Sequence, residues 1–154
     1  MDDVGGAEAA EDLVGRTGEP FTLPVELGKV REFARATKAR HPAYREEDAV
    51  VPPTFPQVMA FWTNRDSDPW SGVPRNWERI LHGEQEFVYH GEPPHVGDVL
   101  TGTTRIDRVY RKEGKRGGSM TFTESVTELR DASGRLVAES RTVGIETSRA
   151  TGEG

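Results

Sequence analysis

From Ile80 onward, apolar and polar side chains alternate with a period of two. This alternation is typical of β-strands, whose successive side chains point to opposite faces of a sheet. Glycine-rich turns separate the runs, and Gly114–Gly118 and Asp131-Ala132-Ser133-Gly134 are the clearest hairpin signals. Strands joined by short turns lie antiparallel. The C-terminal half of the chain therefore predicts one antiparallel sheet made of consecutive strands.

Parity also predicts which side chains share a face of each strand. Residues two apart should lie together: Leu81, Gly83, Gln85, Phe87 and Tyr89 in the first strand, Leu100, Gly102, Thr104 and Ile106 in the second, Met120, Phe122 and Val126 in the third, and Val137, Val143 and Ile145 in the last.

Two helical patterns precede the sheet. Val25–Lys38 places apolar residues at helical spacing and ends before Pro42, which cannot continue a helix. Thr54–Trp62 follows two prolines and is apolar on several sides, which predicts a second, buried helix. A short edge strand is expected over Glu19–Pro24.

A long polar loop, Thr63–Arg79, connects the second helix to the sheet and contains Trp70 and Trp77. Loops of this length are uncommon in compact domains and are often functional. The two indoles can cap a pocket or a subunit interface, or they can simply pin the loop to its own surface.

At 154 residues the chain has the length of one domain. Residues 1–18 are rich in Gly, Ala and acidic side chains, which predicts a disordered leader. The domain is expected to span residues 19–148, and residues 149–154 are expected to form a flexible tail. Helices followed by an antiparallel sheet give the α+β class.

Composition excludes several kinds of function. The net charge of −6 argues against nucleic-acid binding, which needs a basic surface. A basic group around Arg108–Arg116 is either a solvated hairpin tip or an anchor for an anionic carrier. The chain has no cysteine, which excludes thiol catalysis and disulfides. With neither a signal-peptide pattern nor a membrane-length apolar run, the expected location is the cytoplasm.

Known catalytic and cofactor motifs are absent from the sequence. There is no phosphate loop, no dinucleotide fingerprint, no nucleophile elbow and no zinc-protease motif, so no cofactor is expected. Of the four histidines, His82 and His90 lie on one strand at a separation of about 26 Å. This separation is too great for both to bind one metal ion, and no metal site is expected.

The order and spacing of these segments resemble a known family. The helix Val25–Lys38, the Pro-Pro-Thr-Phe helix start, the strand ILHGEQEFVYH, the turn ending in Val96-Gly97-Asp98 and the C-terminal segment TELRDASGRLVAESRTVGIET together are similar to MaoC-like hotdog dehydratases. The resemblance covers roughly residues 19–147 and is closest to the N-terminal, non-catalytic half-domain. It implies a single hotdog fold, in which a curved antiparallel sheet wraps a long central helix.

Active members of this family carry the motif Asp-x-Asn-Pro-x-His after the first helix, where the Asp and His activate water. When the motif is aligned on Pro42, Ala39 stands in place of the Asp and Tyr44 in place of the His. Alanine cannot ionise, and a phenol has an unperturbed pKa of about 10, so neither supplies acid–base catalysis near neutral pH. His41 is the one candidate substitute.

The resemblance implies a role in binding an acyl-CoA or acyl-carrier-protein thioester beside a second hotdog subunit. Backbone N–H groups of Thr54 and Phe55, at a helix start, can polarise a thioester carbonyl. The strand head His82-Gly83-Glu84-Gln85 can line the acyl pocket or the dimer interface, or it can be a solvated strand end. Phe55, Met59 and Trp70 can wall an acyl tunnel or serve only as core.

Three functions follow from these features. The first is a subunit of an (R)-specific enoyl-thioester hydratase or 3-hydroxyacyl-thioester dehydratase, which would be inactive without a catalytic partner. The second is a homodimeric, non-catalytic module that binds acyl thioesters. The third is an acyl-CoA thioesterase, which would need a carboxylate near the second helix, and Glu46, Glu47 and Asp48 are the candidates.

Overall fold

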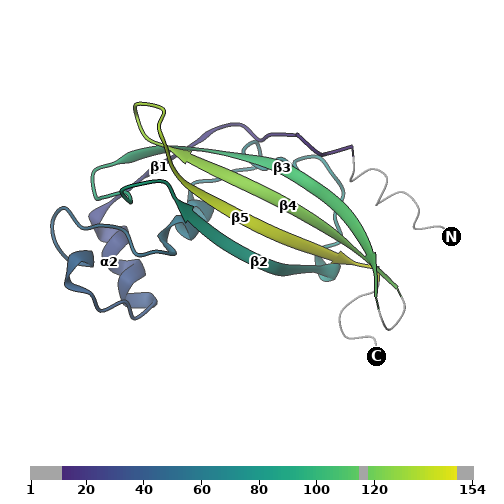
Figure 1. The fold of residues 1–154 in the computed structure, drawn as a ribbon, viewed down its shortest axis with the longest axis horizontal. Coiled ribbons are helices and arrows are strands. Elements are labelled where there is room, and N and C mark those ends of the chain that lie inside the picture. Colours follow the sequence, from purple (N-terminus) through teal and green to yellow (C-terminus); the bar gives the residue numbers. More distant parts are fainter. Residues whose placement is uncertain (1–11, 115–117, 149–154) are drawn as a thin grey trace.

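The computed structural model describes residues 12–114 and 118–148, and a five-stranded antiparallel sheet forms most of this region (Figure 1). The α+β class predicted from the sequence is confirmed. The order in the sheet is β1-β3-β4-β5-β2, and the strands are β1 (Phe21–Pro24), β2 (Ile80–Tyr89), β3 (Val99–Glu113), β4 (Ser119–Arg130) and β5 (Leu136–Thr147).

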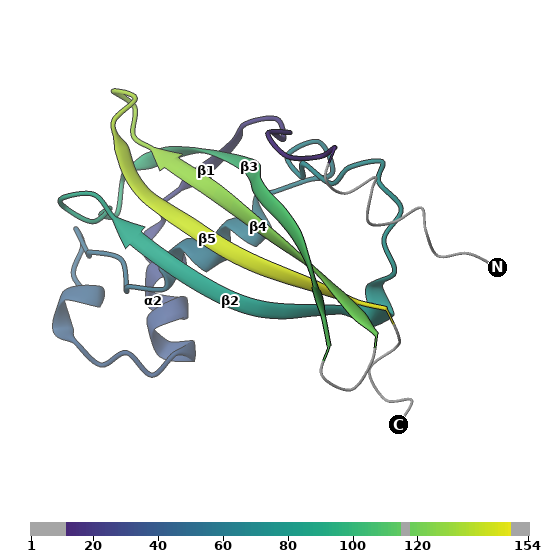
Figure 2. The same cartoon turned by 45° about the vertical axis from the view of Figure 1, so that its right-hand side comes forward.

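The first two longer helical elements lie towards one end of the sheet and against one of its faces, here called the inner face (Figures 1 and 2). The first is α2 (Leu27–Ala36), and the predicted second helix appears as the 3₁₀ helix η2 (Phe55–Phe61). Phe55 of η2 joins Val30 of α2 and Leu129 of the sheet in one hydrophobic core.

The structure differs from the expected long central helix. The element against the core is only seven residues long and has 3₁₀ geometry. Pro56 lies at its second position and lacks a backbone N–H, while the preceding Pro52 accepts a hydrogen bond from the N–H of Phe55 (2.9 Å). This tight turn favours a short 3₁₀ element over a long α-helix.

The leader boundary also differs from the prediction. Gly15 donates its N–H to the carbonyl of Ile106, Gly18 donates to Thr104, and Thr17 forms a bridge with Arg105. Residues 15–18 therefore run along β3 and continue the edge formed by β1. The polar composition hid this role because these contacts are made by the backbone. Residues 1–11 of the predicted leader, and the predicted tail 149–154, lie outside the described residues.

A bulge in β2 corrects the predicted strand faces. The register against β5 shifts between His82 and Glu84, so Gly83 is the extra residue. His82 pairs with Gly144 and Gln85 with Thr142, which places both side chains on the inner face. Leu81 lies on the opposite, outer face and is 40% exposed. Simple parity fails here because it cannot anticipate an inserted residue.

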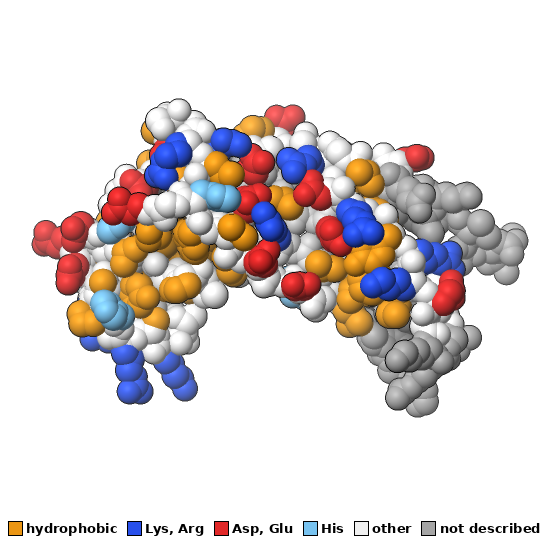
Figure 3. Space-filling view, viewed as in Figure 1, with side chains coloured by type: hydrophobic (Ala, Val, Ile, Leu, Met, Phe, Trp, Pro, Cys, Tyr) orange, Lys and Arg blue, Asp and Glu red, His pale blue; other side chains and the backbone are white. Residues whose placement is uncertain are grey.

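The outer face of the sheet carries an aromatic stack and ion pairs. The rings of Tyr110 and Phe122 stack at 5.0 Å between centroids, and the Lys112 ammonium lies 5.0 Å from the Phe122 ring centroid. Figure 3 shows hydrophobic side chains grouped at both ends of the visible surface, with mixed charges between them. Phe122 and Ile145, from the predicted apolar sets of β4 and β5, pair on the outer face, whereas Val137 of the β5 set lies in the core.

Candidate functional site

The inner face changes from apolar to polar along the strands. The cross-strand partners share a face, so the register divides the inner face into successive rows. The row nearest the helices contains Phe21, Gly102, Leu129, Ala138 and Tyr89. The middle rows contain Thr104, Thr127, Ser140 and Phe87, then Ile106, Ser125, Thr142 and Gln85. The far rows contain Val109, Thr123, Gly144 and His82, then Arg111, Thr121, Glu146 and Ile80.

Hydrogen bonds between side chains satisfy the middle of this surface. The Thr104 and Thr127 hydroxyls lie 2.8 Å apart, within hydrogen-bonding distance. Gln85 donates Nε2–H to Ser140 Oγ (2.8 Å) and accepts from the Thr142 hydroxyl (3.1 Å). The sequence singled out Gln85, and the structure places it among buried hydroxyls and away from the solvated strand end. A polar floor of this kind fits a ligand with oxygen-containing groups.

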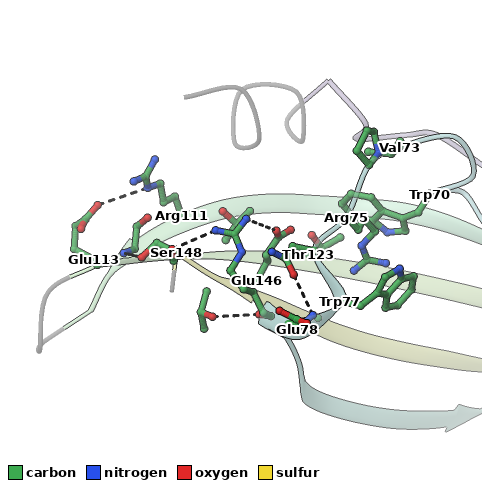
Figure 4. Close-up of a pocket in the computed structure, with 18 residues that line it drawn as sticks. Trp70, Val73, Arg75, Trp77, Glu78, Arg111, Glu113, Thr123, Glu146 and Ser148 are labelled. Atoms are coloured by element: carbon green, nitrogen blue, oxygen red, sulfur yellow. Dashed lines mark hydrogen bonds and ion pairs between the residues drawn. The ribbon is translucent and has the colours of Figure 1, made fainter. Parts of the chain in front are cut away.

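A cavity of about 1040 Å³ lies over the far rows (Figure 4). Thr121, Thr123, Gly144 and Glu146 form part of its sheet-side wall, and the loop leading into η3 (Trp77–Arg79) forms another wall. Trp70, which the sequence named as a candidate, is part of this wall. Arg75, which contacts both Trp70 and Trp77, was not among the residues predicted from the sequence, because these contacts depend on how the loop folds.

Two of the cavity's arginines are paired with carboxylates. Arg79 Nη2 lies 3.5 Å from Glu146 Oε1, and Nη1 donates to the carbonyl of Ser148 (3.2 Å). Arg111 Nε lies 3.6 Å from Glu113 Oε1. The third, Arg75, stacks on indole rings instead: its Cζ atom lies 4.3 Å from the Trp70 centroid and 5.1 Å from the Trp77 centroid.

The segment aligned with the family's catalytic motif lies at the opposite end of the sheet, beside α2. Ala39 follows the helix and donates its N–H to Ala34 O (2.8 Å). His41 caps the short helix η1 (Pro42–Tyr44), where its Nδ1 accepts the Ala43 N–H (3.2 Å). The His41 and Tyr44 rings make a tilted contact at 5.8 Å. In this position Nδ1 of His41 serves as a helix cap.

A second cavity, of about 520 Å³, adjoins this segment and is lined almost entirely by cations. Its lining consists of Arg31, Ala34, Arg35, Lys38, Ala39, Arg40 and Arg45. Arg31 donates two hydrogen bonds to the carbonyl of Arg45, so that part of this charge holds the loop after η1 against α2.

The start of η2 offers fewer free donors than the sequence suggested. The N–H of Phe55 is engaged by Pro52 O, and the Phe55 side chain is 2% exposed. As a result, one of the two predicted carbonyl-polarising donors is already occupied, which corrects that prediction. Met59 packs against the core, while Thr54 is exposed.

Tyr89 joins this end of the sheet to the turn before η2. Its hydroxyl donates to the carbonyl of Pro53 (2.9 Å). Burial, followed by the nearby Tyr44 phenol, raises the pKa of Tyr89 to about 12. Tyr89 is therefore a neutral hydrogen-bond donor at physiological pH.

The structure does not gather the predicted site residues into one cluster. Phe55 and Met59 belong to the helix end, whereas Trp70 lines the far cavity. Ala138 and Glu146, in the rows at these two ends, are eight residues apart on β5, or about 27 Å. Within the described residues, no group of three or more His, Cys, Asp or Glu side chains is placed to hold a metal ion. Nor does any described helix have the length and apolar character needed to cross a membrane.

Comparison with known proteins identifies the family to which this fold belongs. Residues 12–140 match the family model described as "FAS1-like, dehydratase domain region". The chain belongs to this FAS1-like dehydratase family. A UPF0336 protein of Streptomyces coelicolor is 35% identical over 117 residues, which cover 68% of this chain and 75% of that protein. A UPF0336 protein of Streptomyces griseus is 32% identical, covering 86% of this chain and 91% of that protein.

Solved structures show that the frame is the hotdog fold of the MaoC-like dehydratases. A chain of the C-terminally truncated HadBC (3R-hydroxyacyl-ACP dehydratase) complex of Mycobacterium tuberculosis is 28% identical. Its TM-score is 0.68, covering 87% of this chain and 97% of that chain. A chain of the ChsH1–ChsH2 complex from the same organism has a TM-score of 0.75 at 15% identity, covering 96% and 92%. The predicted family and hotdog fold are therefore confirmed.

Proposed function

We propose that this FAS1-like chain is the non-catalytic subunit of an (R)-specific enoyl-thioester hydratase, working in reverse as a 3-hydroxyacyl-thioester dehydratase. The observation that carries the proposal is the segment between α2 and η2. When the family's motif is aligned on Pro42, Ala39 and Tyr44 stand in place of its Asp and His, and Nδ1 of His41 accepts a helix-capping hydrogen bond. The reaction would therefore depend on an acid and a base supplied by a partner.

The role proposed for this chain is to hold the acyl part of a thioester. The short η2 helix packs over the apolar rows, and the large cavity opens over the far rows. The acyl chain of a thioester bound at the partner's catalytic groups would lie along these rows. Thr54, His82, Gly83, Gln85 and Trp70 remain the proposed substrate-side residues, with Phe55 and Met59 supporting them from the core.

A second hotdog subunit is the proposed partner. Among the described strands, β2 is an edge strand of ten residues that pairs only with β5. An edge strand presents unpaired backbone groups that another strand can satisfy. The HadBC and ChsH1–ChsH2 proteins are described as complexes, which supports pairing of this chain with a different hotdog chain.

The test compares the chain alone with the chain co-expressed beside a hotdog protein that carries an intact Asp-x-Asn-Pro-x-His motif. Hydration of crotonyl-CoA is followed by the loss of enoyl-thioester absorbance. We expect activity from the co-purified pair and none from the chain alone. Substituting the partner's His should abolish the activity, whereas His41→Ala in this chain should leave most of it. Brisk hydration by the isolated chain would refute the proposal.

A homodimeric acyl-thioester-binding module is the second candidate. The same β2 edge favours it, because an antiparallel pair of identical strands forms a closed, self-complementary interface. A stable homodimer that binds acyl-CoA, does not exchange subunits with hotdog partners and never hydrates enoyl-CoA would select this alternative. The thioesterase hypothesis is disfavoured, because the Phe55 N–H group that it would use already donates to the carbonyl of Pro52.

A further inference from the structure

Arg75 is held between two indoles at the mouth of the large cavity. Its guanidinium carbon lies 4.3 Å from the Trp70 ring centroid and 5.1 Å from that of Trp77, and Figure 4 shows the three side chains together above the sheet. We call this arrangement the Arg75 clamp. Trp77 is 72% exposed, so one wall of the clamp is open to an incoming ligand.

The cation in the clamp has no polar partner. Among the residues that the structure describes, Arg75 forms neither a hydrogen bond nor an ion pair, and its Nε is a buried atom with no acceptor. Burial lowers the pKa of the guanidinium, and the more distant carboxylates of Asp68 and Glu146 partly offset this effect. Burying a charged donor without an acceptor is costly, so a ligand that supplied one would recover that free energy.

Stacking does not use up the binding capacity of this guanidinium. The guanidinium is planar and its N–H bonds point outward in that plane, so contact with indole rings does not by itself occupy them. A carboxylate binds in that plane through two parallel hydrogen bonds. Among the described residues no acceptor is bonded to the Arg75 guanidinium, so it can receive an anion.

The charges of the cavity's described residues balance, and Arg75 is the arginine among them that has no ion-pair partner. The cavity contains three arginines and three glutamates. Arg79 is paired with Glu146 and Arg111 with Glu113, while Glu78 remains beside the clamp. A ligand with a single carboxylate would pair with this arginine, the one cation of the lining left unpaired in the part of the chain that the structure describes. A polyphosphate would add several negative charges beside three carboxylates, which like-charge repulsion opposes.

The sheet beneath the clamp fits an oxygen-bearing chain better than a plain alkyl chain. Thr121 and Thr123 line the cavity, and the adjoining rows carry the hydroxyls of Ser125 and Thr142. The Thr142 hydroxyl donates to Gln85 Oε1 (3.1 Å), whereas those of Thr121, Thr123 and Ser125 can donate to a ligand. Covering these three with a saturated chain would leave them without solvent partners.

From this geometry we propose that the Arg75 clamp is a specificity site for a carboxylate carried on the acyl chain of the substrate. The inference rests on the proposed function, because it identifies the thioester's acyl group as the ligand. It assigns the substrate class as acyl thioesters with a carboxyl group remote from the thioester. Arg75 would bind that group between Trp70 and Trp77.

The test uses two probes of equal chain length, octanoyl-CoA and the mono-CoA thioester of octanedioic acid, which differ in the terminal carboxylate. Binding to the purified full-length chain is measured by calorimetry and by tryptophan fluorescence. We expect the carboxylated probe to bind at least about tenfold more tightly, the size of a charge-assisted hydrogen-bonded pair. Arg75→Gln should abolish this preference, and Arg75→Lys should restore only part of it, since it keeps the charge without the planar fork.

Arg108→Gln is the matched control, because it removes an equal charge from an exposed arginine that packs on Tyr110. It should leave the preference unchanged, and thermal melting should show that all variants are folded. Equal binding of the two probes would overturn the proposal. So would tight binding of adenosine 3′,5′-bisphosphate that Arg75→Gln weakens, because the clamp would then recognise phosphate.

These outcomes can be separated from failure of the proposed function. Crotonyl-CoA has no terminal carboxylate, so its hydration by the co-purified pair reports only on the subunit role. An active pair with no preference for the carboxylated probe would refute the clamp and leave the subunit role intact. If the pair is inactive but this chain still prefers the carboxylated probe, the subunit role would be refuted and the clamp would stand.

Discussion

The two ends of the inner face are built from the same strands and yet serve opposite purposes. At the helix end, Leu129 and Val30 are fully buried in a core closed by Phe55. At the far end, β4 and β5 present Thr123, Gly144 and Glu146 to a large cavity. The helix end therefore supplies stability through burial of apolar side chains. The far end buries less apolar surface and provides space and polar contacts.

The difference between the ends lies in what covers them. The helix end is covered by α2 and η2, whose apolar side chains complete a hydrophobic cluster. The far end is bordered by the loop between η2 and β2, which contributes indoles and charged side chains to the cavity. η2 has only seven residues, and the large cavity lies over the far rows.

The largest expected effect comes from truncating the core at the helix end. Leu129→Ala should lower the free energy of unfolding by about 2–5 kcal/mol, because a fully buried side chain leaves a cavity behind. Leu81→Ala, on the outer face of the same sheet, should cost less than about 1 kcal/mol. Denaturant unfolding measures both. Equal losses would show that the helix end does not carry the stability.

Substituting one glycine at each end tests the difference in packing with a single added methyl group. A Cβ at Gly102 would collide with the Phe21 ring, whereas a Cβ at Gly144 meets nothing within 4 Å. Gly102→Ala should therefore destabilise the fold by about 1–3 kcal/mol through overpacking. Gly144→Ala should be neutral or slightly stabilising, because alanine loses less conformational entropy. If thermal denaturation shows Gly144→Ala to be the less stable variant, the result would contradict the close packing inferred at Gly102.

The phenol of Tyr89 makes the helix end sensitive to alkaline pH. Its pKa is raised from 10.0 to about 12 in the folded chain, chiefly by burial, so folding favours the protonated form. Its contribution is complete below pH 10 and is lost as the pH rises towards 12. We expect the wild type to lose about 1–2 kcal/mol more than Tyr89→Phe across that range, after allowance for partial solvent exposure. Parallel pH-dependent melts of the two proteins would detect this difference, and identical slopes would contradict it.

The smallest effect belongs to the polar middle rows. Thr127→Val should cost about 1 kcal/mol because it leaves the half-buried Thr104 hydroxyl without its partner. The double variant Thr104→Val, Thr127→Val should recover most of that loss, since both polar groups are then absent. A double-mutant cycle on unfolding free energies tests this coupling. Additive losses would mean that the two hydroxyls do not depend on each other.

Much of the fold follows from local sequence patterns. The alternation from Ile80 onward, the Asp131–Gly134 turn and the Glu19–Pro24 segment correspond to β2 through β5, their hairpin and the edge strand β1. The strand faces were harder to predict. The Gly83 bulge reversed the assignment of Leu81 and His82, because one inserted residue exchanges the two faces of a strand.

The candidate site was only partly accessible from the sequence. Trp70 and Gln85 are chemically conspicuous residues, and each lies in a polar or cavity-lining position. Arg75 was missed because an arginine in a polar loop is ordinary until its neighbours in space are known. Its distinguishing feature is the stacking on two indoles, and only the path of the loop brings all three side chains together.

The sequence alone determined the strand order along the chain and the kinship with a dehydratase frame, and it predicted the loss of that frame's acid–base pair at Ala39 and Tyr44. These properties follow from local periodicity and residue identity, which can be read without the tertiary structure. The tertiary structure alone decided which face of β4 and β5 carries hydroxyls, how short η2 is, and where Arg75 lies. Those properties depend on register and on contacts between segments far apart in the chain, and local patterns do not specify such contacts.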